Sequence, residues 1–340
     1  MAVGEMMRPA QKNLANAVDA MQLKVWLGQL SGAYLRGQEV LPFIDSRQIT
    51  TGNSWQLPVF GYSDSGKHHA VGDSILEDAD YRQTVPVTEK VMYVDKPYTI
   101  NAFIPDWEEM QTHYDTRSQV IQGFAERHAR HSDLLACFAL MTAARSAANI
   151  TGGGTSAEQR TAAGSSSATG ASGQAAPTAC DNAAMLTDGD VLVAALFAAA
   201  QRLDEQDAPS EGRIALLRPS QYYALVTNRQ LLDRDVVRDN GDFADGTVFK
   251  CANIRLVKSN AIQAAAQDYS GATGEIVNYV DDYTENAGVV FHRDAALRLI
   301  RINMEMNAWE DKERYGWVLS TRRIDGYNVK KPEAVVELTV

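Results

Sequence analysis

The chain has 340 residues, of which 45% are apolar and 22% are charged, and its formal net charge is −11. These proportions are typical of a globular protein and argue against global disorder. The length favours a divided core, because single cores stop growing at roughly 250 to 300 residues. The acidic balance argues against tight binding to nucleic acid, but it is compatible with a container whose inner wall lets nucleic acid slide.

No segment of the sequence has the character of a membrane span or of a secretory signal. The richest apolar run, residues 191–200, is shorter than the roughly 18 to 20 residues that a span needs, and residues 1–12 contain no apolar stretch. We therefore expect a soluble protein that is made in the cytoplasm. Cys137, Cys180 and Cys251 form no CxxC pair, which favours reduced thiols over a disulfide framework or a zinc site.

The first predicted elements are an N-terminal arm with a helical turn or two and then a long β-ribbon. Within residues 54–104, apolar and polar positions alternate with period two, as in half-buried strands. Pro58 and Pro86 lie inside these runs, and because proline cannot donate to a strand ladder, each arm of the ribbon is expected to be an edge strand. An isolated ribbon is marginal in water, so we expect a neighbouring subunit to complete its packing.

The predicted tip of the ribbon, residues 61–80, has the composition of a solvated loop and contains a motif that resembles a phosphate-binding loop. Residues 61–67 fit the pattern G-x-x-x-x-G-K, but His68 stands where a magnesium-binding Ser or Thr belongs. No helix is predicted to follow, and a phosphate site needs a helix N-terminus aimed at the anion. A phosphate-binding enzyme is therefore an unfavoured alternative, which predicts that Lys67→Ala abolishes nucleotide binding.

A long helix is predicted from about residue 116 to residue 148. Thr116 and Gln119 have the spacing of a capping box, and apolar residues then recur every three or four positions without an intervening proline. At about 1.5 Å per residue the helix reaches roughly 50 Å. The ribbon followed by this helix is the main structural prediction from the sequence.

Two histidines, His128 and His131, stand on the apolar face of the predicted helix, with Glu126 and Asp133 nearby. A metal site is one interpretation, but a closed site needs further ligands. We favour packing or interface groups, and at an interface the two side chains would be sensitive to pH.

The second half of the chain begins with residues 151–180, which are almost entirely Gly, Ala, Ser and Thr and are expected to form a flexible surface insertion. Alternating helices and strands follow, which predicts an α+β or α/β region. The predicted helices are residues 191–203 and 219–226. The predicted strands are residues 213–217, 254–257, 288–292, 298–304, 315–323 and 335–340.

Catalytic motifs are absent from the sequence. It contains no G-x-S-x-G elbow and no H-E-x-x-H pair. Asp281 and Asp282, followed by Glu285 and Asn286, could bind calcium, but they lack the glycine-centred loop of an EF-hand, so a solvated turn is favoured. We expect no enzyme activity, no cofactor, no metal and no catalytic residue.

Five short stretches occur in order along the chain: Trp55-Gln-Leu-Pro-Val-Phe-Gly61, Val87-Thr-Glu-Lys-Val91, His113-Tyr-Asp115-Thr-Arg-Ser118, Phe291-His-Arg-Asp294 and Pro332-Glu-Ala334. Together with the order of arm, ribbon, long helix, mixed region and returning strands, they resemble the major capsid proteins of short-tailed, autographivirus-type phages, which have the Hong-Kong-97-type fold. The resemblance covers most of the chain from about Leu23, and the insertion after Ile150 is its main departure.

The resemblance implies an α+β fold with an N-terminal arm, an extended loop, a peripheral domain with a spine helix, and an axial domain. We assign residues 1–48 to the arm and 49–104 to the extended loop, and 105–150 to the peripheral domain with the spine helix. Residues 151–296, with the flexible insertion 151–180, form the axial domain, and 297–340 are returning strands, mainly of the peripheral domain.

The implied function is that of a structural subunit, which assembles into hexamers and pentamers of an icosahedral shell around double-stranded DNA. The implied partners are other copies of the chain, a scaffolding protein, a portal protein and in some cases a decoration protein, with the DNA held without sequence-specific contacts and no membrane involved. The expected location is the virion, after assembly in the host cytoplasm. An encapsulin-like compartment shell is an alternative, distinguished by an enzyme cargo gene nearby.

The candidate inter-subunit contacts are Trp55, Phe60, Lys67, His128 and His131. Some members of the wider fold form a covalent cross-link through a lysine on the extended loop, where Lys67 stands. That chemistry also needs an asparagine and an acid on other subunits, which cannot be matched to this sequence, and an unprotonated, desolvated lysine. We therefore do not expect Lys67 to form a cross-link.

Overall fold

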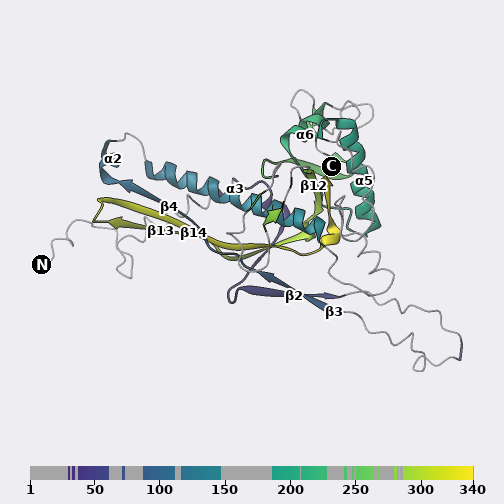
Figure 1. Cartoon of the computed structure of the whole chain (residues 1–340), viewed down its shortest axis with the longest axis horizontal. Coiled ribbons are helices and arrows are strands. Elements are labelled where there is room, and N and C mark those ends of the chain that lie inside the picture. Colours follow the sequence, from purple (N-terminus) through teal and green to yellow (C-terminus); the bar gives the residue numbers. More distant parts are fainter. Residues whose placement is uncertain are drawn as a thin grey trace.

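The protein is an elongated molecule of mixed helix and strand, as predicted (Figure 1). One end is a long extension, which we call the long arm, and the other is a compact part, which we call the axial part after the domain expected there. The structure, a computed structural model, describes residues 30, 33–34, 37–60, 71–72, 87–111, 116–146, 186–206, 208–227, 241–242, 247–248, 250–262, 267–268, 279–281, 283 and 286–339. The predicted ribbon tip and the insertion 151–180 lie outside these residues, apart from Val71 and Gly72.

The long arm is built on a four-stranded sheet in the order β1-β13-β14-β4. Its strands are β1 (Asp45–Gln48), β4 (Tyr98–Pro105), β13 (Ala296–Asp311) and β14 (Gly316–Val329). β1 runs parallel to β13, and the other two pairs are antiparallel. On β13, Met304, Met306 and Ala308 alternate toward the hydrophobic core, which explains why one face of this sheet is covered by a helix.

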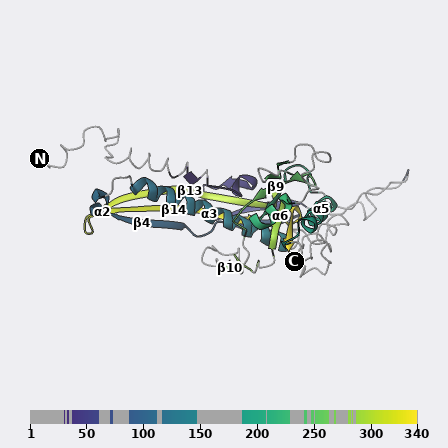
Figure 2. The same cartoon turned by 90° about the horizontal axis from the view of Figure 1, so that it is seen from above.

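The covering helix is α3 (Thr116–Arg145), which we call the spine helix. It lies along β13 and β14 in both views (Figures 1 and 2), and at about 1.5 Å per residue it spans roughly 45 Å. Ile121, Phe124, Leu135 and Phe138 are buried on its inner side. The predicted long helix is therefore confirmed, whereas the predicted capping box depends on a side chain outside the described residues.

The ribbon consists of β2 (Ser54–Phe60) and β3 (Val87–Tyr93), which pair antiparallel from Ser54 opposite Tyr93 to Phe60 opposite Val87. Among the described strands each pairs only with the other, so the prediction of edge strands is confirmed for Pro58. Pro86 lies outside the described residues. Figure 1 shows the ribbon on the side of the long sheet that faces away from α3.

The ribbon is shorter than predicted, because residues 98–104 belong to β4 and pair with β14 instead. β4 has the alternating exposure of a strand with one covered face. A ribbon strand and a sheet strand covered on one face have the same period of two in the sequence. The alternation alone therefore could not separate them.

Gly326 fixes the ribbon base to the long sheet. A Cβ on Gly326 would lie 2.9 Å from the Cα of Val94 and closer still to the carbonyl oxygen of Tyr93. We expect Gly326→Ala to lower the free energy of unfolding by about 1 to 3 kcal/mol, because the backbone must move apart. Gly123→Ala is the control: it meets nothing within 4 Å on the spine helix and should stabilise by about 0.5 to 1 kcal/mol. If urea titrations gave the same change in the free energy of unfolding for Gly326→Ala and Gly123→Ala, this close packing would be contradicted.

The axial part contains a five-stranded sheet in the order β15-β12-β5-β9-β8, with two helices on one face and the C-terminal part of α3 on the other. Its strands are β5 (Arg213–Leu217), β8 (Lys250–Cys251), β9 (Ile254–Lys258), β12 (Asn286–His292) and β15 (Val335–Thr339), and its helices are α5 (Gly189–Glu205) and α6 (Pro219–Val226). The predicted helices and strands of this region are confirmed. Asp188 caps α5 by accepting a hydrogen bond from the backbone N–H of Asp190.

The remaining elements are short. They are α2 (Asp106–Gln111), β6 (Gly241–Asp242), β7 (Thr247–Val248), β10 (Gln267–Asp268), β11 (Val280–Asp281) and the 3-10 turns Leu41–Phe43, Arg293–Ala295 and Pro332–Ala334. β11 holds Asp281, while Asp282 and Glu285 of the calcium alternative lie outside the described residues. Cys137 and Cys251 are buried, and Cys180 is also outside.

Candidate functional site

The ribbon presents two of the predicted contact residues in different settings. Trp55 is half-buried under the guanidinium of Arg47, whose Cζ lies 4.2 Å from the ring centroid. It packs on the cluster of Met92, Val94, Leu297 and Leu299 at the ribbon base. Phe60, at the far end of β2, is 66% exposed. The ring of Phe60 is therefore accessible to another molecule, whereas much of the Trp55 ring is covered by its own chain. Lys67 lies outside the described residues.

His128 and His131 lie between the spine helix and the long sheet. His128 is fully buried and its Nε2 is 2.9 Å from the hydroxyl of Thr321 on β14. The chain's own sheet thus covers this position on the apolar face, as the packing interpretation expects, and a contact of His128 with another subunit stays a prediction. His131 is partly buried and stacks on the ring of Tyr98, with centroids 3.8 Å apart.

Burial shifts the titration of both histidines. Desolvation, with the nearby charge of Arg323 as the next cause, lowers the pKa of His128 to about 3 and the pKa of His131 to about 4. Both side chains are neutral at physiological pH as a result.

A buried charged cluster surrounds these histidines. Arg323 is fully buried and its Nε donates to Asp325 Oδ1 at 2.9 Å, while Arg298 Nε donates to Asp325 Oδ2 at 3.1 Å. Tyr327 donates its hydroxyl to the same carboxylate at 2.8 Å. Burial alone would raise the pKa of Asp325, but the two guanidinium groups hold it below its usual value. One carboxylate thus organises two buried arginines at the centre of the arm.

The cluster extends onto the spine helix and the N-terminal segment. Arg323 Nη1 donates to the carbonyl oxygen of His128 at 2.6 Å and also to the hydroxyl of Ser132, and Arg298 Nη2 donates to the hydroxyl of Tyr34 at 2.9 Å. Buried charges that are paired and hydrogen-bonded in this way hold their elements in one relative position. The cluster therefore joins helix, sheet and N-terminal segment.

Asp133, which the sequence suggested only as a possible metal ligand, makes a second anchor. It is 3% exposed, and its carboxylate accepts backbone N–H bonds from Glu39, Val40 and Leu41 at 2.8, 3.0 and 3.2 Å. Burial raises the pKa of Asp133, and these three bonds oppose the rise. Its position on the apolar face was the sequence signal for burial, but its partners are almost a hundred residues away.

The tip of the long arm exposes a group of large apolar side chains. β4, α2 and the turn between β13 and β14 meet there (Figure 1), and the backbone N–H of Asp106 donates to the carbonyl oxygen of Tyr315 at 3.0 Å. We call this group the arm tip: Phe103 (40% exposed), Trp107 (71%), Met110 (80%), Trp309 (50%) and Tyr315 (78%). Half of the ten exposed large apolar side chains among the described residues thus gather at one end.

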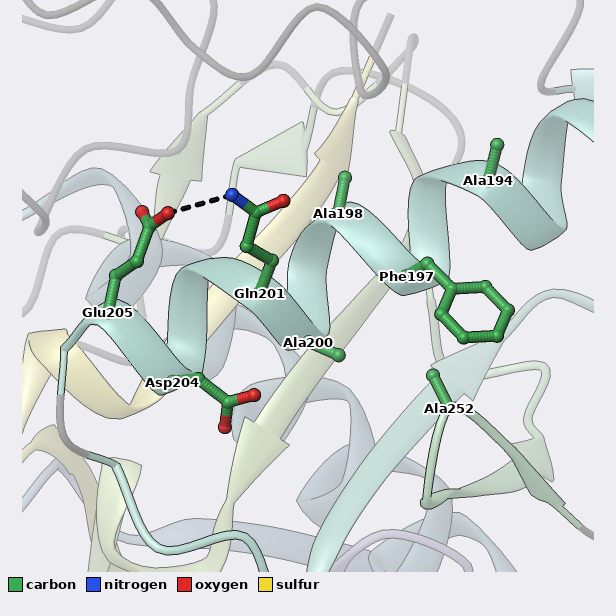
Figure 3. Close-up of a pocket in the computed structure, with 8 residues that line it drawn as sticks. All are labelled: Ala194, Phe197, Ala198, Ala200, Gln201, Asp204, Glu205 and Ala252. Atoms are coloured by element: carbon green, nitrogen blue, oxygen red, sulfur yellow. Dashed lines mark hydrogen bonds between the residues drawn. The ribbon is translucent and has the colours of Figure 1, made fainter.

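A shallow groove of about 950 Å³ lies on the outer side of α5. Figure 3 shows that the lining comes from α5 except for Ala252, which lies beside the ring of Phe197. Gln201 donates to Glu205 at 2.8 Å at the groove's other end. Four of its eight lining residues are alanines, and its polar side chains, Gln201, Asp204 and Glu205, are exposed, unlike the converging buried polar groups of a small-molecule site.

The described residues form neither a metal cluster nor a membrane-spanning helix. In this part of the chain no three His, Cys, Asp or Glu side chains are grouped as metal ligands. Among the same residues, no helix is long and apolar enough to cross a membrane.

Comparison with known proteins gives a consistent result. The profile of the Gp10A-like family, described as a major capsid protein, matches residues 56–316. The major capsid protein of Escherichia phage T7 is 29% identical over 215 residues, which cover 61% of this chain and 56% of the T7 protein. The matched region thus spans little more than half the length of that relative.

Solved structures of similar shape include phage capsids. The capsid of cyanophage P-SCSP1u has a TM-score of 0.70 and 26% identity over 88% of both chains. The mature capsid of bacteriophage PhiM1 has a TM-score of 0.67 at 16% identity, covering 87% of this chain and 85% of that one. The second likeness shows the fold alone.

Proposed function

The chain belongs to the Gp10A-like family of major capsid proteins, and from this membership we propose that it is the structural subunit of a phage head, which assembles with copies of itself into a closed shell. The observation that supports assembly most directly is the arm tip, where five large apolar side chains are exposed together. Monomeric proteins seldom leave such groups uncovered. Aromatic side chains and Met are also the types enriched in subunit interfaces.

The experiment that tests this function is sedimentation of the purified full chain, alone and with its scaffolding protein. We expect fast-sedimenting particles of uniform size in at least one assembly condition. A chain that stays monomeric under every condition would contradict a shell subunit.

We further propose that each segment of the chain forms the domain that the sequence predicts for it. Residues 49–104 contain the ribbon that overlaps a neighbour, 105–150 the spine helix of the peripheral domain, and 151–296 the axial domain near each capsomer centre. Residues 1–48 form the N-terminal arm, which is distinct from the long arm, and residues 297–340 form the returning strands. The separation of the long sheet from the axial sheet supports this division.

The partners follow from the same proposal. Hexamers and pentamers of this chain would enclose double-stranded DNA, with a scaffolding protein during assembly, a portal protein at one vertex and, in some shells, a decoration protein. The formal net charge of −11 supports contact with DNA that is weak and not sequence-specific. A structural role without enzyme activity is part of this proposal, and neither the encapsulin-like nor the phosphate-binding alternative is better supported.

The ribbon supplies a test of inter-subunit contact. We expect Phe60→Ser to reduce the yield of particles several-fold and to leave the urea midpoint of the subunit unchanged, because the ring is 66% exposed. Trp55→Ala is the comparison variant, and it should lower the midpoint because its ring packs within the subunit. Normal particle yield with Phe60→Ser would remove Phe60 from the interface.

A further inference from the structure

The hydrogen bonds around His128 assign its protonation state. The hydroxyl of Thr321 donates its single proton to the carbonyl oxygen of Ile100 at 3.2 Å, so its oxygen accepts from His128, and Nε2 of that ring carries the proton. The other nitrogen, Nδ1, is buried and has no hydrogen-bond partner among the described residues. A proton on Nδ1 would therefore be a buried charge with no acceptor there.

His131 is assigned in the same way by Arg323. A guanidinium group can only donate, so the 3.1 Å contact between Arg323 Nη2 and His131 Nδ1 makes Nδ1 the acceptor. Protonation of Nδ1 would break this bond and place a second positive charge against the guanidinium. The contact of His131 with Arg323 therefore requires a neutral ring. For His128 the contact with Thr321 would survive protonation, but the added charge on Nδ1 would be buried without an acceptor among the described residues.

From this geometry we propose that His128 and His131 form an acid-sensitive latch, in which two neutral imidazoles hold the spine helix on the long sheet and acidification loosens the arm before the axial part. The latch is a property of the single subunit and does not depend on assembly. No histidine faces the five-stranded sheet from α5 or α6, so the axial part has no equivalent group on those helices.

Among the described residues, charged groups of both signs surround the latch. β14 contributes Arg323 and Asp325, β13 contributes Arg298, and Tyr98 of β4 contacts both rings. The other facing groups are Ser132, Thr321, Tyr34 and Tyr327. Arg323 is the strongest charge acting on both rings and lowers their pKa values more than Asp325 raises them, so protonation of either imidazole adds repulsion with its guanidinium.

The direction of the pH effect follows from the depressed pKa values. Free histidine has a pKa of about 6.5, whereas in the folded arm the pKa values are about 3 for His128 and about 4 for His131. The latch is therefore fully stabilising above about pH 6.5 and weakens as the pH falls. As the pH falls from about 6 to 4, protonation of each histidine in the open state lowers the equilibrium constant for closing the latch about tenfold per pH unit. The two histidines together lower it about 100-fold per pH unit. Burial raises the pKa of Asp133, so this carboxyl group favours the folded state as the pH falls and partly opposes the effect of the histidines.

Hydrogen exchange of the full chain, read as protection factors at pH 7 and pH 4.5, tests the latch. We expect α3 to lose protection at least tenfold more than α5 and β5. His128→Gln keeps a donor toward Thr321, and His131→Asn keeps an acceptor toward Arg323, so the double variant should fold and show no such differential loss. His292→Gln, which alters a histidine outside the cluster, should behave as the wild type.

A second measurement does not depend on the variants. With 15N-labelled histidine, the ring nitrogens of His128 and His131 should show the neutral Nε2–H form at pH 7 and at pH 5. A titration midpoint near 6.5 for both rings, or equal loss of protection in α3 and α5 in the wild type, would overturn the proposal. A differential loss that persists in the folded double variant would also overturn it.

Discussion

Trp107→Ser combined with Tyr315→Gly is expected to abolish particle formation without destabilising the subunit. Both rings are more than two-thirds exposed, at 71% and 78%, so their removal takes little from the core of the monomer. Tyr315 has a φ of 49°, where glycine is less strained than a residue with a side chain. Aromatic anchors at an interface contribute about 2 kcal/mol or more each, and a shell repeats the loss in every subunit.

The measurements are particle yield by sedimentation and subunit stability in urea. Arg314→Gln is the control, because it changes the same turn at an exposed charged side chain and removes no apolar surface. We expect the control to assemble normally and the double variant to remain as stable, soluble subunits. Normal assembly of the double variant would show that these two rings of the arm tip are not in a contact that assembly needs.

Asp325→Asn is expected to have the largest effect on folding. The substitution keeps the shape of the side chain but leaves Arg298 and Arg323, which are 6% and 0% exposed, without their shared carboxylate. Breaking a buried ion pair by removing one partner lowers stability by about 3 to 5 kcal/mol. Because the same cluster joins the spine helix to the sheet, unfolding should begin in the arm.

A neighbouring surface pair provides the matched control. Glu305 forms an ion pair with Arg322, with Oε2 and Nη2 2.7 Å apart, but the side chain of Glu305 is 39% exposed and that of Arg322 is 47% exposed. Glu305→Gln should therefore lower the free energy of unfolding by less than about 1 kcal/mol. If urea unfolding gave similar losses for both variants, the buried cluster would not be the main polar anchor of the arm.

The sequence predicted elements whose pattern is local. Periodicity located the spine helix, and proline in a period-two run identified β2 as an edge strand. The pattern could not tell that residues 98–104 join β14, because exposure of one face gives the same alternation in a ribbon and in a sheet. Strand partners far apart in the chain have no local signature.

The same limit applies to the side chains of the site. Phe60 was predicted as a contact and is exposed, but nothing in the sequence separated it from Trp55, which packs at the ribbon base. His128 was predicted at an interface and lies inside the arm, because its partner Thr321 is 193 positions away. The arm tip was missed because its residues come from three separate segments that meet only in the fold.

We propose that this chain forms a shell in which neighbouring copies cover its exposed ribbon and arm tip. Electron cryomicroscopy of the assembled particles tests it most directly. We predict a closed shell in which density from adjacent subunits covers Phe60, Trp107 and Tyr315. Particles in which these three side chains face solvent, or a failure to find particles under any assembly condition, would contradict the claim.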